Sequence, residues 1–173
     1  MDRLFLIYAL LLASGSAFAQ TPYAGMQNRP IKALSEQQVA DLNAGRGVGM
    51  ALAAELNGYP GPSHTLELAY KLELSADQHA SVKAMFNSMK AEALLLGAKL
   101  IEQEADLDKQ FSSRTITPES LKASTAAVAV TQGQLREAHL KYHPLTVAIL
   151  SPGQMQRYAE LRGYSGKPMK HHH

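Results

Sequence analysis

Apolar residues recur in steps of three and four along two long stretches of this chain, residues 76–111 and 118–142. The spacing appears at Phe86, Met89, Ala93, Leu96, Leu100 and Leu107 in the first stretch, and at Leu121, Val128, Leu135, Ala138 and Tyr142 in the second. This is the spacing of a single apolar face on an α-helix. Residues 112–117 form a polar break, and Thr117-Pro118 is typical of a helix start with proline at its first position. We therefore predict a long antiparallel helical hairpin.

Shorter helical segments flank these two stretches. Ser35 stands three residues before Gln38, which is a capping-box pattern at a helix start, and Gly45 is expected to end that helix. Pro144 lacks a backbone N–H and should kink or end the second long helix. No stretch shows the alternation of a strand, so the predicted fold class is all-α. The further short helices are predicted at residues 50–56, 63–72 and 152–162.

Two five-residue cassettes carry the most specific signal, Leu74-Ser75-Ala76-Asp77-Gln78 and Leu150-Ser151-Pro152-Gly153-Gln154. Each places a serine three residues before a glutamine, so each forms a capping box. The pair resembles the LTxxQ motif of the periplasmic Spy/CpxP family, with serine in place of threonine, and the resemblance covers about residues 63–164. Relatives in that family include zinc-associated periplasmic proteins and CnrX-type metal sensors. The resemblance implies a cradle-shaped antiparallel homodimer of helical hairpins.

The first residues are typical of a secretory signal peptide. Arg3 precedes an apolar run over residues 4–13, and Ala17-Phe18-Ala19 fits a cleavage site. We expect cleavage after Ala19 and a periplasmic protein with no membrane span in the mature chain; an uncleaved anchor is the alternative, although spanning takes about 20 apolar residues. The predicted organisation is a signal at 1–19, a lead-in at 20–62, a hairpin domain at 63–165 and a tail at 166–173. His171–His173 is either a tag remnant or a native tail.

Composition narrows the function. The chain has no cysteine and a formal net charge of +2, so it offers no thiolate and no basic stripe for nucleic acid. Tryptophan is absent, which disfavours a large aromatic ligand pocket. No Ser-His-Asp or His-Glu-x-x-His arrangement is visible. We expect neither catalysis nor nucleic-acid binding.

The histidines are the candidate chemistry. His139 and His143 stand four residues apart, so on a helix both imidazoles can reach one ion. The alternative is a pair of ordinary surface histidines, and Pro144 disfavours helical backbone at His143. A hairpin turning near residues 114–115 would bring His139 level with residue 90 and His143 level with residue 86. If the chain also folds back at the first cassette, the helix that starts at Ser63 would bring His64 level with residue 85. The predicted metal ligands are His64, Glu67, Glu92, His139 and His143, with Glu67 and Glu92 as alternative carboxylates.

The resemblance to CnrX-like sensors implies the same kind of site. Those sensors bind metal through histidines of an early helix, a glutamate of the long helix, and a late histidine followed four residues later by methionine. His64 and His139 match the early and late histidines, while His143 stands where the pattern has methionine. The second early histidine is missing, since position 68 is leucine, which puts nickel or cobalt selectivity in doubt. Imidazole with a carboxylate suits zinc, copper, nickel or cobalt.

The sequence therefore predicts a periplasmic Spy/CpxP-like protein that binds a divalent transition metal in a heavy-metal or envelope-stress response, with an envelope signalling protein as a partner. The alternative is a metal-independent chaperone that holds unfolded client proteins through weak apolar and charged contacts.

Overall fold

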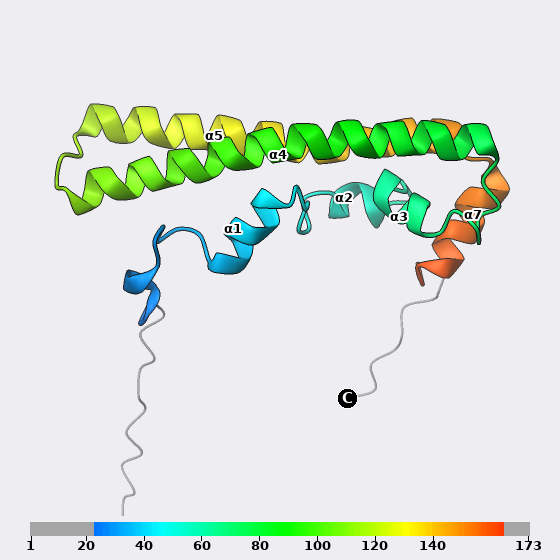
Figure 1. Ribbon diagram of the computed structural model, residues 1–173, viewed down its shortest axis with the longest axis horizontal. Helices are drawn as coiled ribbons and strands as arrows, with labels where there is room; N and C mark the ends of the chain where they lie inside the picture. The colour runs from blue at the N-terminus through cyan, green and yellow to red at the C-terminus, as the bar shows by residue number, and fades with distance from the viewer. Residues whose placement is uncertain (1–22, 165–173) are drawn as a thin grey trace, which may run out of the picture.

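The computed structural model describes residues 23–164, and all of its regular elements are helices. Helix α4 (Ala76–Ser112) packs antiparallel against α5 (Pro118–Leu140), which continues as α6 (Tyr142–Ile149) (Figure 1). With 37 residues, α4 is about 55 Å long at 1.5 Å per residue. The predicted all-α hairpin is confirmed. The predicted signal peptide and the histidine tail lie outside the described residues.

Capping side chains fix where the hairpin helices begin. The Ser75 side chain accepts from the Gln78 N–H and starts α4, and the Thr117 side chain accepts from the Ser120 N–H and starts α5 with Pro118 at its first position. The interruption expected near Pro144 is present, because α5 ends at Leu140 and α6 begins at Tyr142. Proline has no N–H to donate to the carbonyl four residues earlier.

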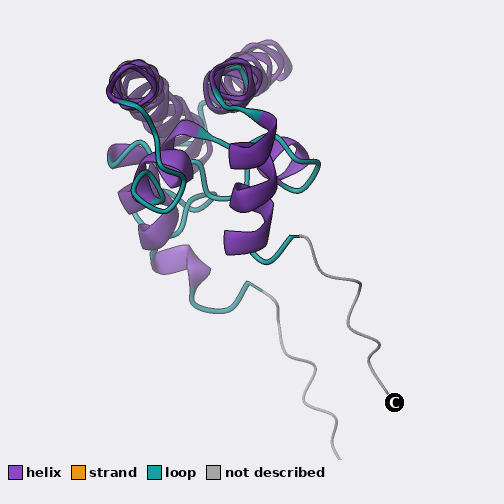
Figure 2. Cartoon of the chain, turned by 90° about the vertical axis from the view of Figure 1, so that its right-hand side faces the viewer, coloured by secondary structure: helices purple, strands orange, loops and turns teal. Residues whose placement is uncertain are grey.

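The other helices form a second layer on one side of the hairpin. Figure 2 shows this layer end-on, beneath the two long helices. It begins with the short 3-10 helix η1, and the last helix turns away from the hairpin's open end (Figure 1). Its elements are η1 (Met26–Asn28), α1 (Glu36–Asn43), α2 (Leu52–Glu55), α3 (Pro62–Glu67) and α7 (Pro152–Leu161).

The predicted apolar faces supply most of the core between these layers. One cluster joins Leu34 and Leu42 of the second layer to side chains of both long helices, namely Ala93, Leu100, Val128 and Leu135. Gly97 lets the layers approach closely, since a Cβ there would lie 2.7 Å from the Leu42 carbonyl oxygen. Toward the hairpin turn the cover thins, and Phe111 remains 54% exposed.

The two cassettes meet at the open end of the hairpin. The Gln78 and Gln154 side-chain amides hydrogen-bond to each other in both directions, at 2.9 and 3.0 Å. Gln78 also donates to the Ile149 carbonyl and Gln154 to the Leu72 carbonyl. We call this arrangement the glutamine clamp. It joins the start of α4 to the start of α7, a contact that the capping-box pattern does not predict.

Two short helices differ from expectation. Helix α2 spans only Leu52–Glu55, within the predicted residues 50–56, and α3 ends at Glu67 although the prediction ran to residue 72. Turns continue from α3 to Glu73, which has a left-handed φ of 52° and directly precedes the first cassette. None of the helices from residue 23 to 164 has the length and hydropathy to cross a membrane.

Candidate functional site

A cavity of about 550 Å³ lies between the hairpin and the segment that covers its open half. The glycine-rich loop at residues 45–49 and the turn into α3 form its cover, while α4, α5 and α6 form its base. The predicted level-matching across the hairpin is visible here, because Phe86, Met89 and Lys90 line the same cavity as His139 and His143. His64 of α3 also lines it. The structure thus brings three of the predicted ligands to one cavity.

His143 is held in one orientation. The residue is 5% exposed, and its Nδ1 lies 2.6 Å from the Tyr59 carbonyl oxygen. A carbonyl can only accept, so Nδ1 is the donor of this hydrogen bond, and Nε2 is the ring nitrogen left to bind a ligand. Gly61 packs on the ring, and a Cβ at that position would lie 2.7 Å from Cε1. Metal-binding histidines usually donate their second ring N–H to such an acceptor.

His139 is the more deeply buried partner, at 4% exposed. Burial lowers the pKa of its imidazole, and the nearby His143 lowers it further, so both effects favour the neutral ring. Its Nε2 is buried and has no hydrogen-bond partner among residues 23–164, which costs free energy unless something binds it. The backbone of Gly47 covers the ring, since a Cβ there would lie 2.9 Å from Nδ1.

His64 faces a buried carboxylate that sequence reasoning missed. Its Nδ1 lies 3.4 Å from Oε1 of Glu55, a residue 6% exposed. The same oxygen accepts from the Tyr158 hydroxyl at 2.5 Å and lies 3.4 Å from the Arg162 guanidinium. Burial, followed by the hydrogen bond to Glu55, raises the pKa of Tyr158. Glu55 therefore joins α2 and α3 to α7, and only its place in an otherwise apolar short helix hinted at this.

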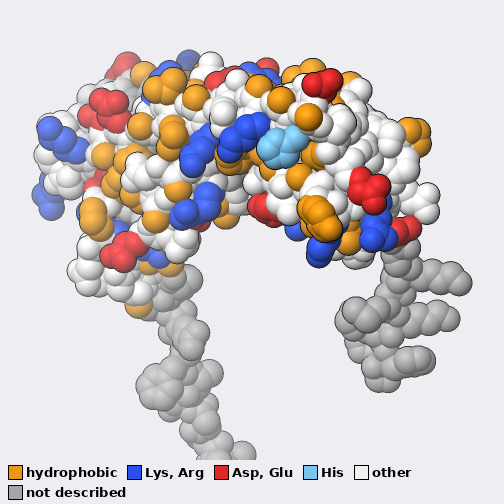
Figure 3. All heavy atoms as spheres, turned by 45° about the vertical axis from the view of Figure 1, so that its right-hand side comes forward, with side chains coloured by type: hydrophobic (Ala, Val, Ile, Leu, Met, Phe, Trp, Pro, Cys, Tyr) orange, Lys and Arg blue, Asp and Glu red, His pale blue; other side chains and the backbone are white. Residues whose placement is uncertain are grey.

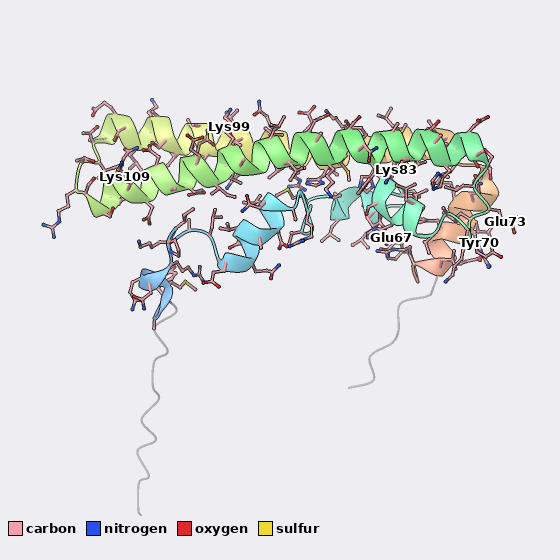
Figure 4. All side chains as sticks on the ribbon, in the orientation of Figure 1. Glu67, Tyr70, Glu73, Lys83, Lys99 and Lys109 are labelled. Carbon is pink, nitrogen blue, oxygen red and sulfur yellow. The ribbon has the colours of Figure 1, made fainter. Side chains whose placement is uncertain are left out.

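The two predicted carboxylate ligands do not line the cavity. Glu92 accepts from the Tyr142 hydroxyl at 2.6 Å and pairs with Lys141 at 2.5 Å. These hydrogen bonds, the one from Lys141 first, lower the pKa of Glu92. Glu67 is exposed at the end of α3 and accepts from Ser63 at 3.4 Å (Figure 4).

The available ligand atoms are of a type that binds transition metals, but there are too few of them to complete a coordination sphere. Imidazole suits zinc, copper and nickel, and the buried Nε2 of His139 has no hydrogen-bond partner among residues 23–164. Within the part of the chain that the structure describes, no three histidine, aspartate or glutamate side chains converge closely enough to hold one ion. The five-residue metal set therefore stays a prediction.

Comparison with known proteins adds no relative. No protein-family model matches this chain, and neither a curated protein nor a solved structure matches it significantly.

Proposed function

We propose that this chain binds a divalent transition metal ion, such as zinc, copper, nickel or cobalt, through the imidazoles of His139 and His143, with His64 nearby. The observation that carries the proposal is the hydrogen bond from His143 Nδ1 to the Tyr59 carbonyl. It leaves Nε2 of His143 as the ring nitrogen available to a metal in the cavity that His139 also lines. When His64 also coordinates, the ion would join α3 to the hairpin.

The biological role belongs to the same proposal. The chain acts in a heavy-metal or envelope-stress response outside the cytoplasm, as its resemblance to the Spy/CpxP family implies. An ion that binds one arrangement of the cover better than another shifts the population toward it. Metal occupancy would in this way change the surface offered to a second copy or to a signalling protein.

Calorimetric titration with zinc and nickel tests the metal proposal. The protein is the full chain with His171, His172 and His173 replaced by Ala, because a free histidine triplet binds metal by itself. Replacing both His139 and His143 with Ala should abolish tight binding. The matched control is His79→Ala, which removes an exposed histidine of α4. Equal affinity in the double variant and its parent refutes the proposal.

The second candidate is the metal-independent chaperone, and one observation favours it. Val48, Leu52 and Leu56 are 53–64% exposed at four-residue spacing beside the cavity. Figure 3 shows hydrophobic side chains interspersed with basic ones on one face of the molecule, a mixture that suits weak client contacts. Light scattering of an aggregating client protein tests this. A Leu52→Ser and Leu56→Ser double variant should lose protection while the His139 and His143 variant keeps it.

A further inference from the structure

The cavity is much larger than one metal ion requires. Imidazole nitrogens bind zinc directly at about 2.0–2.1 Å, so an all-protein ion site closes tightly around the ion. This cavity measures about 550 Å³, within the roughly 300–1,000 Å³ of pockets that hold small molecules. The protein also brings no third histidine or carboxylate close enough to complete the coordination, among the residues described. Space and missing ligands together call for a ligand that arrives with the ion.

The cavity wall indicates the charge of that ligand. Lys90 lines the cavity and makes no ion pair with any residue from 23 to 164. Arg46 lines it as well, although its guanidinium is 2.6 Å from Asp41. The only carboxylate in the lining is Glu55, whose Oε1 contacts Tyr158 and Arg162 and whose Oε2 is buried without a partner among the residues described. The lining therefore carries two cationic side chains and one carboxylate, and Lys90 is the cation without an ion pair.

The glycine-rich loop at residues 45–49 adds backbone N–H groups, which, like Lys90, would favour an anionic ligand. The backbone N–H groups of Gly47, Val48 and Gly49 donate to no other residue of the described chain. Val48 and Gly49 have consecutive left-handed φ angles of 29° and 82°, and all three residues line the cavity. Successive unpaired backbone amides in a turn can form a concavity that binds anions.

We propose that the cavity takes its metal as an anionic chelate, a divalent transition metal already bound to a small polycarboxylate. This inference rests on the proposed metal binding and names the form in which the metal arrives. His139 and His143 replace water on the metal, while Lys90 and the loop amides contact the carboxylates. A bare cation would bind beside an uncompensated lysine, whereas the carboxylates of the chelate offset that charge.

Citrate distinguishes binding of the chelate from binding of the bare ion, because it should change the apparent affinity for nickel in opposite directions in the two cases. Nickel is titrated into the full chain carrying the three tail substitutions, with and without equimolar citrate. If the protein binds the chelate, citrate should tighten the apparent affinity for nickel by about tenfold or more, which is about 1.4 kcal/mol. If the protein binds the bare ion, citrate withdraws nickel from it and weakens the affinity. Unchanged or weaker affinity therefore overturns the inference and leaves the proposed function standing.

Variants of α4 test the role assigned to Lys90. Lys90→Met should weaken nickel–citrate binding roughly fivefold, the upper range for an exposed ion pair, and should not weaken binding of nickel alone. Lys99→Met is the matched control, because Lys99 is an exposed lysine farther along α4 from α3 (Figure 4), and it should change neither. An equal effect of both variants overturns the inference. Citrate binding as tightly without nickel overturns the inference alone, whereas no binding of nickel in either form overturns the proposed function too.

Discussion

Replacing Gln154 with Leu should destabilise this protein far more than the loss of a helix cap. The side chain makes four hydrogen bonds, one with the Ser151 N–H at 2.9 Å, one with the Leu72 carbonyl at 3.2 Å and two with Gln78. A typical intramolecular hydrogen bond contributes about 0.5–1.5 kcal/mol net. Because the clamp is partly buried, we expect a loss of about 2–4 kcal/mol in the free energy of unfolding.

The chain offers a matched control in its third capping box. Gln38 accepts from the Ser35 N–H at 2.8 Å, as Gln154 does from Ser151, and makes no hydrogen bond to another helix among the residues described. Gln38→Leu should therefore cost only about 0.5–1 kcal/mol. Urea unfolding followed by circular dichroism at constant m-value measures both variants.

A double-mutant cycle makes the test stricter. Gln78 and Gln154 share two of their hydrogen bonds, so each single variant removes both. The Gln78→Leu and Gln154→Leu double variant should therefore be about 1–3 kcal/mol more stable than the sum of the two losses indicates. Additive losses, or a Gln154→Leu cost no larger than that of Gln38→Leu, would refute the reasoning, because the two cassettes would then be independent caps.

Two further substitutions probe the cavity and its support. Gly47→Ala should weaken nickel binding and cost about 1–3 kcal/mol of stability, because its Cβ would lie 2.9 Å from His139 Nδ1. The control Gly133→Ala, on the open side of α5 with no heavy atom within 4 Å, should stabilise the protein by about 0.5–1 kcal/mol. Denaturant unfolding and calorimetry measure both variants, and equal effects would mean that the loop does not pack on the ring. Glu55→Gln should cost about 1–3 kcal/mol of stability, because the hydrogen bonds to an amide oxygen are weaker than those to a carboxylate. Limited proteolysis should then release α7 earlier than in the control Glu36→Gln, which changes an exposed residue. Unchanged cleavage would contradict the inference that Glu55 joins α2 and α3 to α7.

Local sequence signals accounted for the hairpin because helix starts and helix faces are local properties. A serine followed three residues later by glutamine satisfies backbone donors wherever it stands, so Ser75 and Ser151 start helices as predicted. The three- and four-residue spacing then decides which side of each helix becomes buried. The prediction was less accurate for α3, which ends at Glu67 and continues as turns toward the first cassette.

The sequence predicted how far along the hairpin each candidate residue lies. It did not predict the direction in which each side chain points. Level-matching placed His139 near residue 90, and both line the cavity. Glu92 has nearly the same level but binds Tyr142 and Lys141, because a level does not specify which way a side chain points. Glu55 reaches Tyr158 only after α7 folds back, a contact spanning 103 residues, and no local pattern encodes it.

The glutamine clamp and the cavity are parts of one arrangement. Gln78 donates to the Ile149 carbonyl at the end of α6, the helix that carries His143, and Gln154 donates to the Leu72 carbonyl in the turns that follow α3, the helix that carries His64. Each glutamine therefore fixes an element that presents an imidazole to the cavity, while its serine only caps its own helix. This separates the two roles within each cassette. The serines define where helices start, and the glutamines determine how the histidine-bearing helices stand relative to each other.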